Sequence, residues 1–314
     1  MNLTLQQTFF AVFGGLVLLV AAASLLAHWL ATHTADAVKT TWLNQLNSRI
    51  QAGWLIGLLF AVGFALGETA LSVIFALASF FALREFVALT PIKPADHTAL
   101  IIAFYVVIPL QYVLVAGGWY QFYAVFIPVY LFLVLPMVMA WRLDTELYLQ
   151  RVAKVQWGLM LSVFCVSHAP AIATLEPPGY EGRGPLLLLY YLLVVQLADV
   201  FAVMASASVG RTPLLSNPNK SREGALIGGT AAALLGTALW WMTPFSWWQA
   251  ALMSTVTVVT VSLGGMVLSS VKRSLGERQW DQGVALSRGV LERLEGLTFS
   301  APVFFHLTVY FFVP

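Results

Sequence analysis

The sequence predicts an all-α, polytopic integral membrane protein with about ten transmembrane helices. Of its 314 residues, 60% are hydrophobic and only 10% are charged, whereas about a quarter of the residues in soluble domains are charged. Apolar runs of roughly 20 residues, long enough to cross a hydrocarbon core, recur along the chain. Basic residues gather in alternate segments between these runs.

Each predicted span is an apolar run that ends where polar residues return. The spans are Phe9–Leu30, Trp54–Gly67, Ala70–Phe86, Leu100–Ala116, Tyr120–Ala140, Trp157–Leu175, Pro185–Ala205, Ala225–Met242, Trp247–Leu268 and Phe299–Val313. We expect the first run to be a retained span, because the residues before it lack the basic region of a signal peptide. The second and third spans are separated only by residues 67–69, so a helical hairpin and one broken helix both stay open.

The distribution of basic residues predicts the orientation of the chain. All but one of the 16 Lys and Arg residues fall in segments 31–53, 84–99, 141–156, 206–224 and 269–298. The exception is Arg183. Under the positive-inside rule these five segments are cytoplasmic, and both termini are therefore predicted to be non-cytoplasmic.

The chain is expected to form a single membrane domain over residues 1–314. Residues 1–155 would be its N-terminal helices, and residues 156–314 carry most of the polar residues. The one cysteine, Cys165, excludes an intrachain disulfide framework and a metal site built from cysteines. No nucleic-acid partner is predicted.

An ionisable residue inside a predicted span marks a candidate site, because burying charge in hydrocarbon is costly. Asp199 is the clearest case, and Gln196 lies one turn earlier on the same helical face. The aspartate is a candidate metal ligand or phosphate-site carboxylate. The alternative is a buried aspartate that a neighbouring helix satisfies.

A basic turn follows that span. Lys220, Ser221 and Arg222 stand just before the next apolar run. Lysine supplies a point charge, arginine a planar fork, and N–H groups at a helix start add donors, so the turn predicts a phosphate-binding site. An ordinary basic cytoplasmic loop explains the same residues equally well. The five histidines show no metal-ligand spacing, and we assign them no chemistry.

Two polar motifs stand out in the C-terminal part. Residues 217–224 have the sequence Asn-Pro-Asn-Lys-Ser-Arg-Glu-Gly, and residues 269–295 form a dense charge cluster that begins Ser-Ser-Val-Lys-Arg. The first resembles the Ser-Pro-x-Lys-Thr-x-Glu-Gly motif of the phosphatidate cytidylyltransferase (CDP-diacylglycerol synthase) family, and the second matches that family's signature without a gap. Residues 299–306 are similar to the last span of a longer bacterial branch. Motif similarity covers roughly the last 120 residues, which makes residues 156–314 the cytidylyltransferase-like part.

The resemblance implies which residues face phosphate. In active members, two divalent cations on acidic residues hold the phosphates of CTP against the phosphate of phosphatidate. The family's phosphate-facing positions are kept here, with one Lys exchanged for Arg, at Ser269, Lys272, Arg273, Arg278, Gly289 and Arg293.

The metal-facing positions depart from the family pattern. Gly265 and Gln279 stand where the family has aspartates, and Ser287 stands where it has the histidine of its signature. Glu292 and Glu295 replace two further aspartates, which keeps both charges but moves each carboxylate outward by about one methylene. The candidate catalytic and metal-ligating residues are Asp199, Glu292 and Glu295.

Two hypotheses of function stay open. The first is an active nucleotidyltransferase that transfers CMP from CTP to phosphatidate, or a related lipid phosphate, giving CDP-diacylglycerol and pyrophosphate in phospholipid synthesis. The second is a catalytically degenerate homologue that binds an anionic lipid or a nucleotide as an accessory or regulatory membrane subunit. A lipid transporter or scramblase would rest on topology alone.

The resemblance also implies partners and location. An active member would take CTP and phosphatidate, or another anionic lipid, with Mg²⁺ as cofactor. It would form a homodimer, and the branch it resembles belongs to the bacterial inner (cytoplasmic) membrane.

Overall fold

The computed structural model describes residues 13–15, 17, 21, 24–25, 50–51, 53–54, 57–90, 92–214, 220–277 and 289–313. Every regular element within these ranges is a helix, and β-type pairing is limited to an isolated bridge between Pro213 and Ser221. The all-α prediction is therefore confirmed for the described part of the chain.

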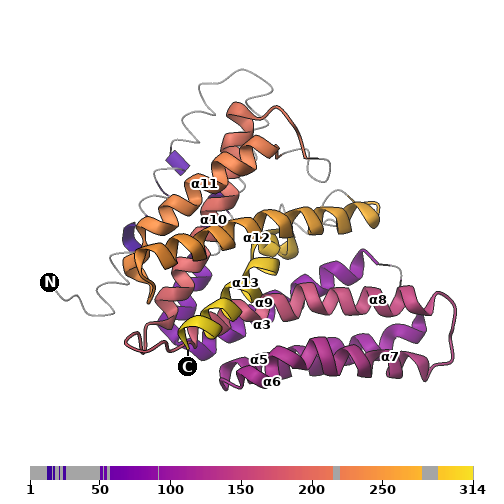
Figure 1. The fold of residues 1–314 in the computed structure, drawn as a ribbon. Helices are drawn as coiled ribbons and strands as arrows, with labels where there is room; N and C mark the ends of the chain where they lie inside the picture. The colour runs from indigo at the N-terminus through magenta and orange to yellow at the C-terminus, as the bar shows by residue number, and fades with distance from the viewer. Residues whose placement is uncertain are drawn as a thin grey trace.

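The helices follow one another with short connections (Figure 1). They are α3 (Glu68–Ala88), α4 (His97–Ile102), α5 (Ile108–Ala116), α6 (Tyr120–Val125), α7 (Phe132–Ala140), α8 (Tyr148–Leu159), α9 (Cys165–Ala173), α10 (Gly184–Val209), α11 (Arg222–Ala238), α12 (Trp247–Ser274) and α13 (Val290–Phe312). Three π-helical segments join α4 to α5, α6 to α7 and α8 to α9, so that each pair forms one long rod. These segments are Ala103–Val107, Phe126–Leu131 and Met160–Phe164.

Six described helices or rods are long and apolar enough to cross a membrane. They are Glu68–Ala88, Pro94–Ala116, Tyr120–Ala140, Tyr148–Ala173, Gly184–Val209 and Trp247–Ser274. The 17-residue α11 and α13, which has charged residues near its start, fall outside this group. Most of the first predicted span lies outside the described residues. Six spans thus match the sequence prediction, whereas the full number of ten and the orientation of both termini stay predictions.

The chain bends sharply at Gly67, which separates a helix at Gly57–Leu66 from α3. Gly67 has φ +96°, a conformation that residues with a Cβ rarely adopt. A Cβ on Gly63 would lie 2.7 Å from Leu71 Cδ1, although a straight helix would separate the two residues by about 12 Å along its axis. The structure thus favours the helical hairpin, and it corrects the separator from three residues to one.

Three helices join the two sides of the molecule. Figure 1 shows α5 to α8 as one group of roughly parallel rods and α10 to α12 as a second group, in which α12 lies at a steep angle to α10 and α11. The helices α3, α9 and α13 lie between the two groups. The central position of α13 is consistent with its packing against α3, α9, α10 and α12. The last helix of the chain is therefore held by elements from both halves of the sequence.

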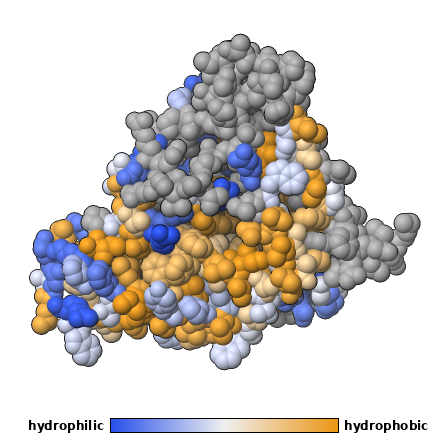
Figure 2. Space-filling model, turned by 180° about the vertical axis from the view of Figure 1, so that it is seen from behind, coloured by the Kyte–Doolittle hydropathy of each residue, from blue (hydrophilic) through white to orange (hydrophobic). Residues whose placement is uncertain are grey.

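Much of the surface is apolar. Figure 2 shows a broad hydrophobic face with hydrophilic residues gathered at one end and near its upper centre. Large apolar side chains on α4 to α7, including Ile101, Val113, Phe132 and Met137, are more than half exposed. Soluble monomers rarely expose patches of this extent, so this surface fits contact with lipid tails.

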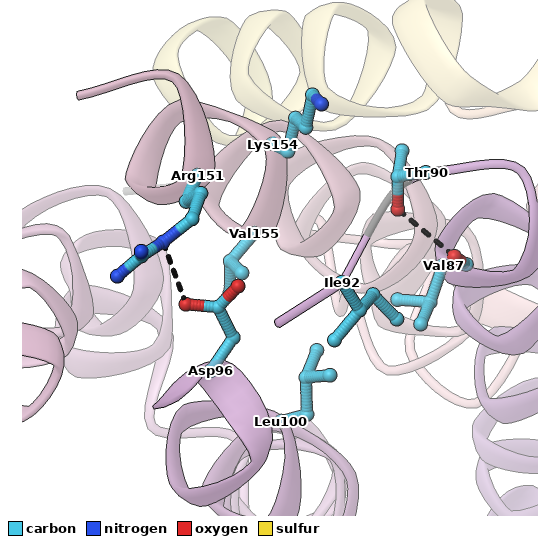
Figure 3. A pocket seen from close by; sticks show the side chains of 8 residues that line it. All are labelled: Val87, Thr90, Ile92, Asp96, Leu100, Arg151, Lys154 and Val155. Carbon is cyan, nitrogen blue, oxygen red and sulfur yellow. Dashed lines mark hydrogen bonds and ion pairs between the residues drawn. The ribbon is translucent and has the colours of Figure 1, made fainter. Parts of the chain in front are cut away.

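A buried ion pair ties the rod that begins at Pro94 to α8 (Figure 3). Arg151 Nε lies 3.0 Å from Asp96 Oδ1, and both side chains are only 4% exposed. Arg151 Nη1 also lies 2.8 Å from Asp144 Oδ2 in the loop before α8. The guanidinium therefore holds two segments that approach α8 from different directions.

We expect Asp96→Ala to lower the free energy of unfolding by about 3–5 kcal/mol, because it leaves a buried guanidinium without one of its partners. Lys93→Ala is the matched control, since its ion pair with Glu146 is partly exposed and should contribute about 1 kcal/mol or less. Unfolding in mixed detergent micelles measures both. Equal losses for the two variants would contradict the structural role of the buried pair.

Candidate functional site

The close approach of α10 and α11 brings two predicted site residues together. A Cβ on Gly228 would lie 2.4 Å from the backbone nitrogen of Ala202, so only a glycine allows this crossing. The turn before α11 is thereby held beside α10. Lys220 Nζ lies 2.8 Å from Asp199 Oδ1, and the two side chains are 16% and 26% exposed. Asp199 is thus partly exposed and paired with the turn before α11, whereas the alternative interpretation expected a buried aspartate satisfied by a neighbouring helix.

A short hairpin presents Lys220 at this point. The Leu214 N–H donates to the Lys220 carbonyl at 2.8 Å, and the Arg222 N–H donates to the Thr212 carbonyl at 3.0 Å. Ser221 then begins α11 as its N-cap, with its hydroxyl accepting from the Gly224 N–H. The Ser221 oxygen, a predicted phosphate contact, is therefore already engaged in the helix start.

Glu223 holds the residues on the other side of this hairpin, Arg211 and Thr212. Its carboxylate accepts hydrogen bonds from the Arg211 N–H, the Thr212 N–H and the Thr212 hydroxyl. Hydrogen bonds to the ionised form favour that form, and those from Thr212 contribute most to lowering the pKa of Glu223 to about 2. The negative charge that organises this turn is therefore present throughout the physiological pH range.

A cavity of about 780 Å³ lies between α10, α11 and α12. Small and apolar side chains such as Ala202, Leu226, Val261 and Met266 form much of its wall. Three basic residues also line it: Lys220, Arg222 and Arg273. Volumes of several hundred cubic ångströms with a few placed polar groups are typical of small-molecule sites, and this combination suits an amphipathic anion.

Two carboxylates converge on one ammonium beside this cavity. The buried Nζ of Lys272 lies 3.9 Å from Glu292 Oε2 and 3.7 Å from Glu295 Oε2. Ser269 Oγ donates to Glu295 Oε1 at 3.5 Å. The glutamates come from the first two turns of α13 and the other two residues from α12. The packing of these helices therefore assembles four of the predicted site residues.

Gly265 connects the carboxylate group with the cavity. It lines the cavity, and a Cβ at this position would lie 3.8 Å from Glu295 Oε1. A side chain here would thus point toward Glu295. The family has an aspartate at the position of Gly265, and the structure places this position next to the carboxylate of Glu295.

The predicted metal ligands do not all meet. Glu292 and Glu295 share Lys272, whereas Asp199 pairs with Lys220. Within the described ranges, no group of three or more His, Cys, Asp or Glu residues is arranged to hold a metal ion. Arg293 lies on the same turn of α13 as Glu292. Three residues of the sequence argument lie outside the described residues: Arg278, Gln279 and Ser287.

The sequence-based limits of the last two spans were too short. We expected Trp247–Leu268 and Phe299–Val313, but α12 continues to Ser274 and α13 begins at Val290. The extra turns carry the polar cluster. Apolar runs mark only the part of a helix that lies in hydrocarbon, so the sequence pattern missed helical turns that continue beyond the apolar run.

Sequence reasoning also missed Glu85. This α3 carboxylate accepts from the Val290 N–H at 2.7 Å and the Leu291 N–H at 2.8 Å, and so caps α13. A signal was present, because Glu85 is an ionisable residue inside the predicted span Ala70–Phe86. His168, one of the histidines to which we assign no chemistry, is fully buried, with Nδ1 2.8 Å from the Phe164 carbonyl oxygen.

Taken together, the fold and the site define an integral membrane protein with a basic cavity beside a carboxylate pair. A model of the cytidylyltransferase family matches residues 47–311, and the chain belongs to this family.

Similar proteins cover different shares of the chain. It is 29% identical over 273 residues to the uncharacterized protein YnbB of Escherichia coli, which covers 85% of this chain and 88% of that protein. It is 28% identical over 194 residues to a phosphatidate cytidylyltransferase of Helicobacter pylori, covering 58% and 72%. A phosphatidate cytidylyltransferase of Mycobacterium leprae is 36% identical over 129 residues, covering 39% and 40%.

We expect the carboxyl of Glu223 to titrate near pH 2 rather than near its ordinary value of 4.5. Its pKa is lowered in the folded state, so its stabilising effect is complete above pH 4.5 and is lost as the pH falls through about 2. A ¹³C chemical-shift titration of labelled glutamate, assigned with Glu223→Gln, measures this. A midpoint near 4.5 would contradict the hydrogen-bonded hairpin.

Proposed function

We propose that the protein is a phosphatidate cytidylyltransferase-like enzyme. It would transfer CMP from CTP to phosphatidate, or a related lipid phosphate, and release pyrophosphate. Membership of the cytidylyltransferase family and the names of several relatives support this reaction. A homodimer in the bacterial inner membrane stays a prediction.

The cavity between α10, α11 and α12 carries the proposal. The cavity wall contains Lys220, Arg222 and Arg273, and small or apolar side chains form most of the rest of it. Charge-assisted hydrogen bonds from lysine and arginine suit phosphate oxygens. A lipid phosphate combines that anionic head with an apolar body, so its two parts match the two kinds of wall.

Glu292 and Glu295 fit a cation site that a substrate completes. Mg²⁺ is often held by one or two carboxylates together with substrate phosphates, and both glutamates already converge on Lys272 Nζ. We propose that these two residues would hold Mg²⁺, which would neutralise charge on the CTP phosphates. Asp199 lies outside this pair, because it is paired with Lys220 and no group of three such ligands occurs among the described residues.

The residues of the chain have separate tasks in this reaction. An oxygen of the lipid phosphate attacks the α-phosphorus of CTP, the bond to the β-phosphate oxygen breaks, and pyrophosphate leaves. Lys220, Arg222 and Arg273 would bind and orient the lipid phosphate. Lys272 would turn from its glutamates toward the nucleotide phosphates. Positioning and charge neutralisation are the main contributions that a protein makes to such transfers.

Purified protein with Mg²⁺, labelled CTP and phosphatidate is expected to yield CDP-diacylglycerol and pyrophosphate. Arg273→Ala should raise KM for phosphatidate about tenfold or more, because it removes a charged hydrogen-bond donor. Arg183→Ala is the control, since this exposed arginine precedes α10 outside the site. No product above background, across several metals and lipid phosphates, would exclude the proposed reaction.

Gly265→Asp should increase metal-dependent turnover. The new carboxylate would lie beside Glu295 and add a negative charge and a ligand next to the pair. Gly265→Asn is the matched control, because it has the same shape without the charge. A rise with both variants, or a loss with Gly265→Asp alone, would contradict the placement of a cation at this pair.

A second candidate is a catalytically degenerate homologue that binds an anionic lipid or a nucleotide. Gly265 in place of a carboxylate and the pairing of Asp199 with Lys220 favour it. This candidate predicts that phosphatidate-containing vesicles or labelled CTP bind the protein, that Arg273→Ala weakens lipid binding, and that no turnover accompanies either.

A further inference from the structure

Glu85 lies at the start of α13 although 205 positions separate it from Val290 in the sequence. Its Oε1 accepts from the Val290 N–H at 2.7 Å and its Oε2 from the Leu291 N–H at 2.8 Å. These amides are among those that a helix start leaves without partners. The carboxylate also lies at the positive end of the helix dipole, where a negative charge is stabilising.

Gly289 makes room for this contact. It is the N-cap residue of α13 with φ −61° and ψ 159°, a conformation open to any residue. A Cβ at this position would nevertheless lie 2.6 Å from Glu85 Oε2. A side chain that usually caps helices, such as Asp or Ser, could therefore stand here only if the Glu85 carboxylate moved away from the amides it binds.

The capped helix carries the carboxylate pair in its first two turns. Glu292 and Glu295 follow directly after the two amides that Glu85 binds, and both face Lys272 of α12. A two-point contact fixes both the rotation and the first turn of α13. The cavity residues Lys220, Arg222 and Arg273 lie on other elements, namely the turn before α11, α11 itself and α12.

We propose that Glu85 is a positioning residue of the site: it sets α13 so that Glu292 and Glu295 converge on one point. The role in turnover rests on the proposed cytidylyltransferase function. The effect of Glu85 on the start of α13 does not rest on that function, and it is measured separately from turnover.

The kinetic test compares Glu85→Ala with the wild-type protein. A misplacement of about 1 Å in a reacting group can cost about 100-fold in rate. We expect kcat to fall by about that factor, whereas KM for phosphatidate should change less than about threefold because the cavity cations lie on other elements. Glu68→Ala, at the opposite end of α3, is the matched control and should leave both constants unchanged.

A compensating variant separates positioning from general damage. Gly289→Asp alone should impair turnover, since its side chain meets the Glu85 carboxylate. In the Glu85→Ala background the same substitution has space, restores one carboxylate and can cap α13 itself. The kcat of the double variant should therefore be at least tenfold higher than that of Glu85→Ala. A double variant no better than Glu85→Ala would overturn the proposal.

Hydrogen exchange provides the readout that does not need activity. In full-length protein in detergent, peptides containing Val290 and Leu291 should exchange at least tenfold faster in Glu85→Ala and return toward the wild-type rate in the double variant. Unchanged exchange would overturn the positioning role whatever the activity. Faster exchange in a protein whose wild type has no turnover would support the positioning role and reject the proposed function.

Discussion

Charge inside an apolar protein must be paired, and this constraint shapes the structure from the first described span to the last. Removing one charge from water costs several kcal/mol unless a partner and hydrogen bonds compensate. Asp96 accordingly meets Arg151, and Lys272 meets two glutamates. The Glu85 carboxylate accepts hydrogen bonds from two N–H groups at a helix start. The Asp96–Arg151 pair and the contact of Glu85 with α13 join elements that are distant in the sequence, and Lys272 joins the consecutive helices α12 and α13. These contacts therefore also fix how the helices are arranged.

The same pairing sets the chemistry of the site. Lys220 is held by Asp199, and Lys272 is held by Glu292 and Glu295. A phosphate would have to compete with a carboxylate for each lysine, and a cation would have to compete with a lysine for the glutamates. A phosphate and a divalent cation that bind together relieve both competitions at once. The phosphate becomes the new partner of the lysine, and the cation becomes the new partner of the carboxylate.

The parts of this arrangement that follow from local pattern could be predicted from the sequence. Apolar runs predicted the six described helices or rods that are long and apolar enough to cross a membrane. The basic turn and Asp199 were predicted as candidates from the sequence, but not their contact with each other. The sequence did not predict the one-residue break at Gly67 or the extra turns of α12 and α13. Hydropathy indicates which residues lie in hydrocarbon, and it does not indicate where a helix begins or ends. The role of Glu85 was missed for a different reason. Its charge inside a predicted span was a signal, but its partners are backbone amides, which no sequence pattern indicates.

The balance of charge bears on how many cations the carboxylate group would bind. Glu292 and Glu295 carry two negative charges, and Lys272 offsets one of them. Gly265 adds none at the position that faces Glu295. If Lys272 turns toward a nucleotide phosphate, the pair regains both charges and matches one divalent ion, with phosphate oxygens completing its coordination. A second ion at the same place would need a further carboxylate, and within the described part of the chain no third ligand of this kind is grouped with the pair.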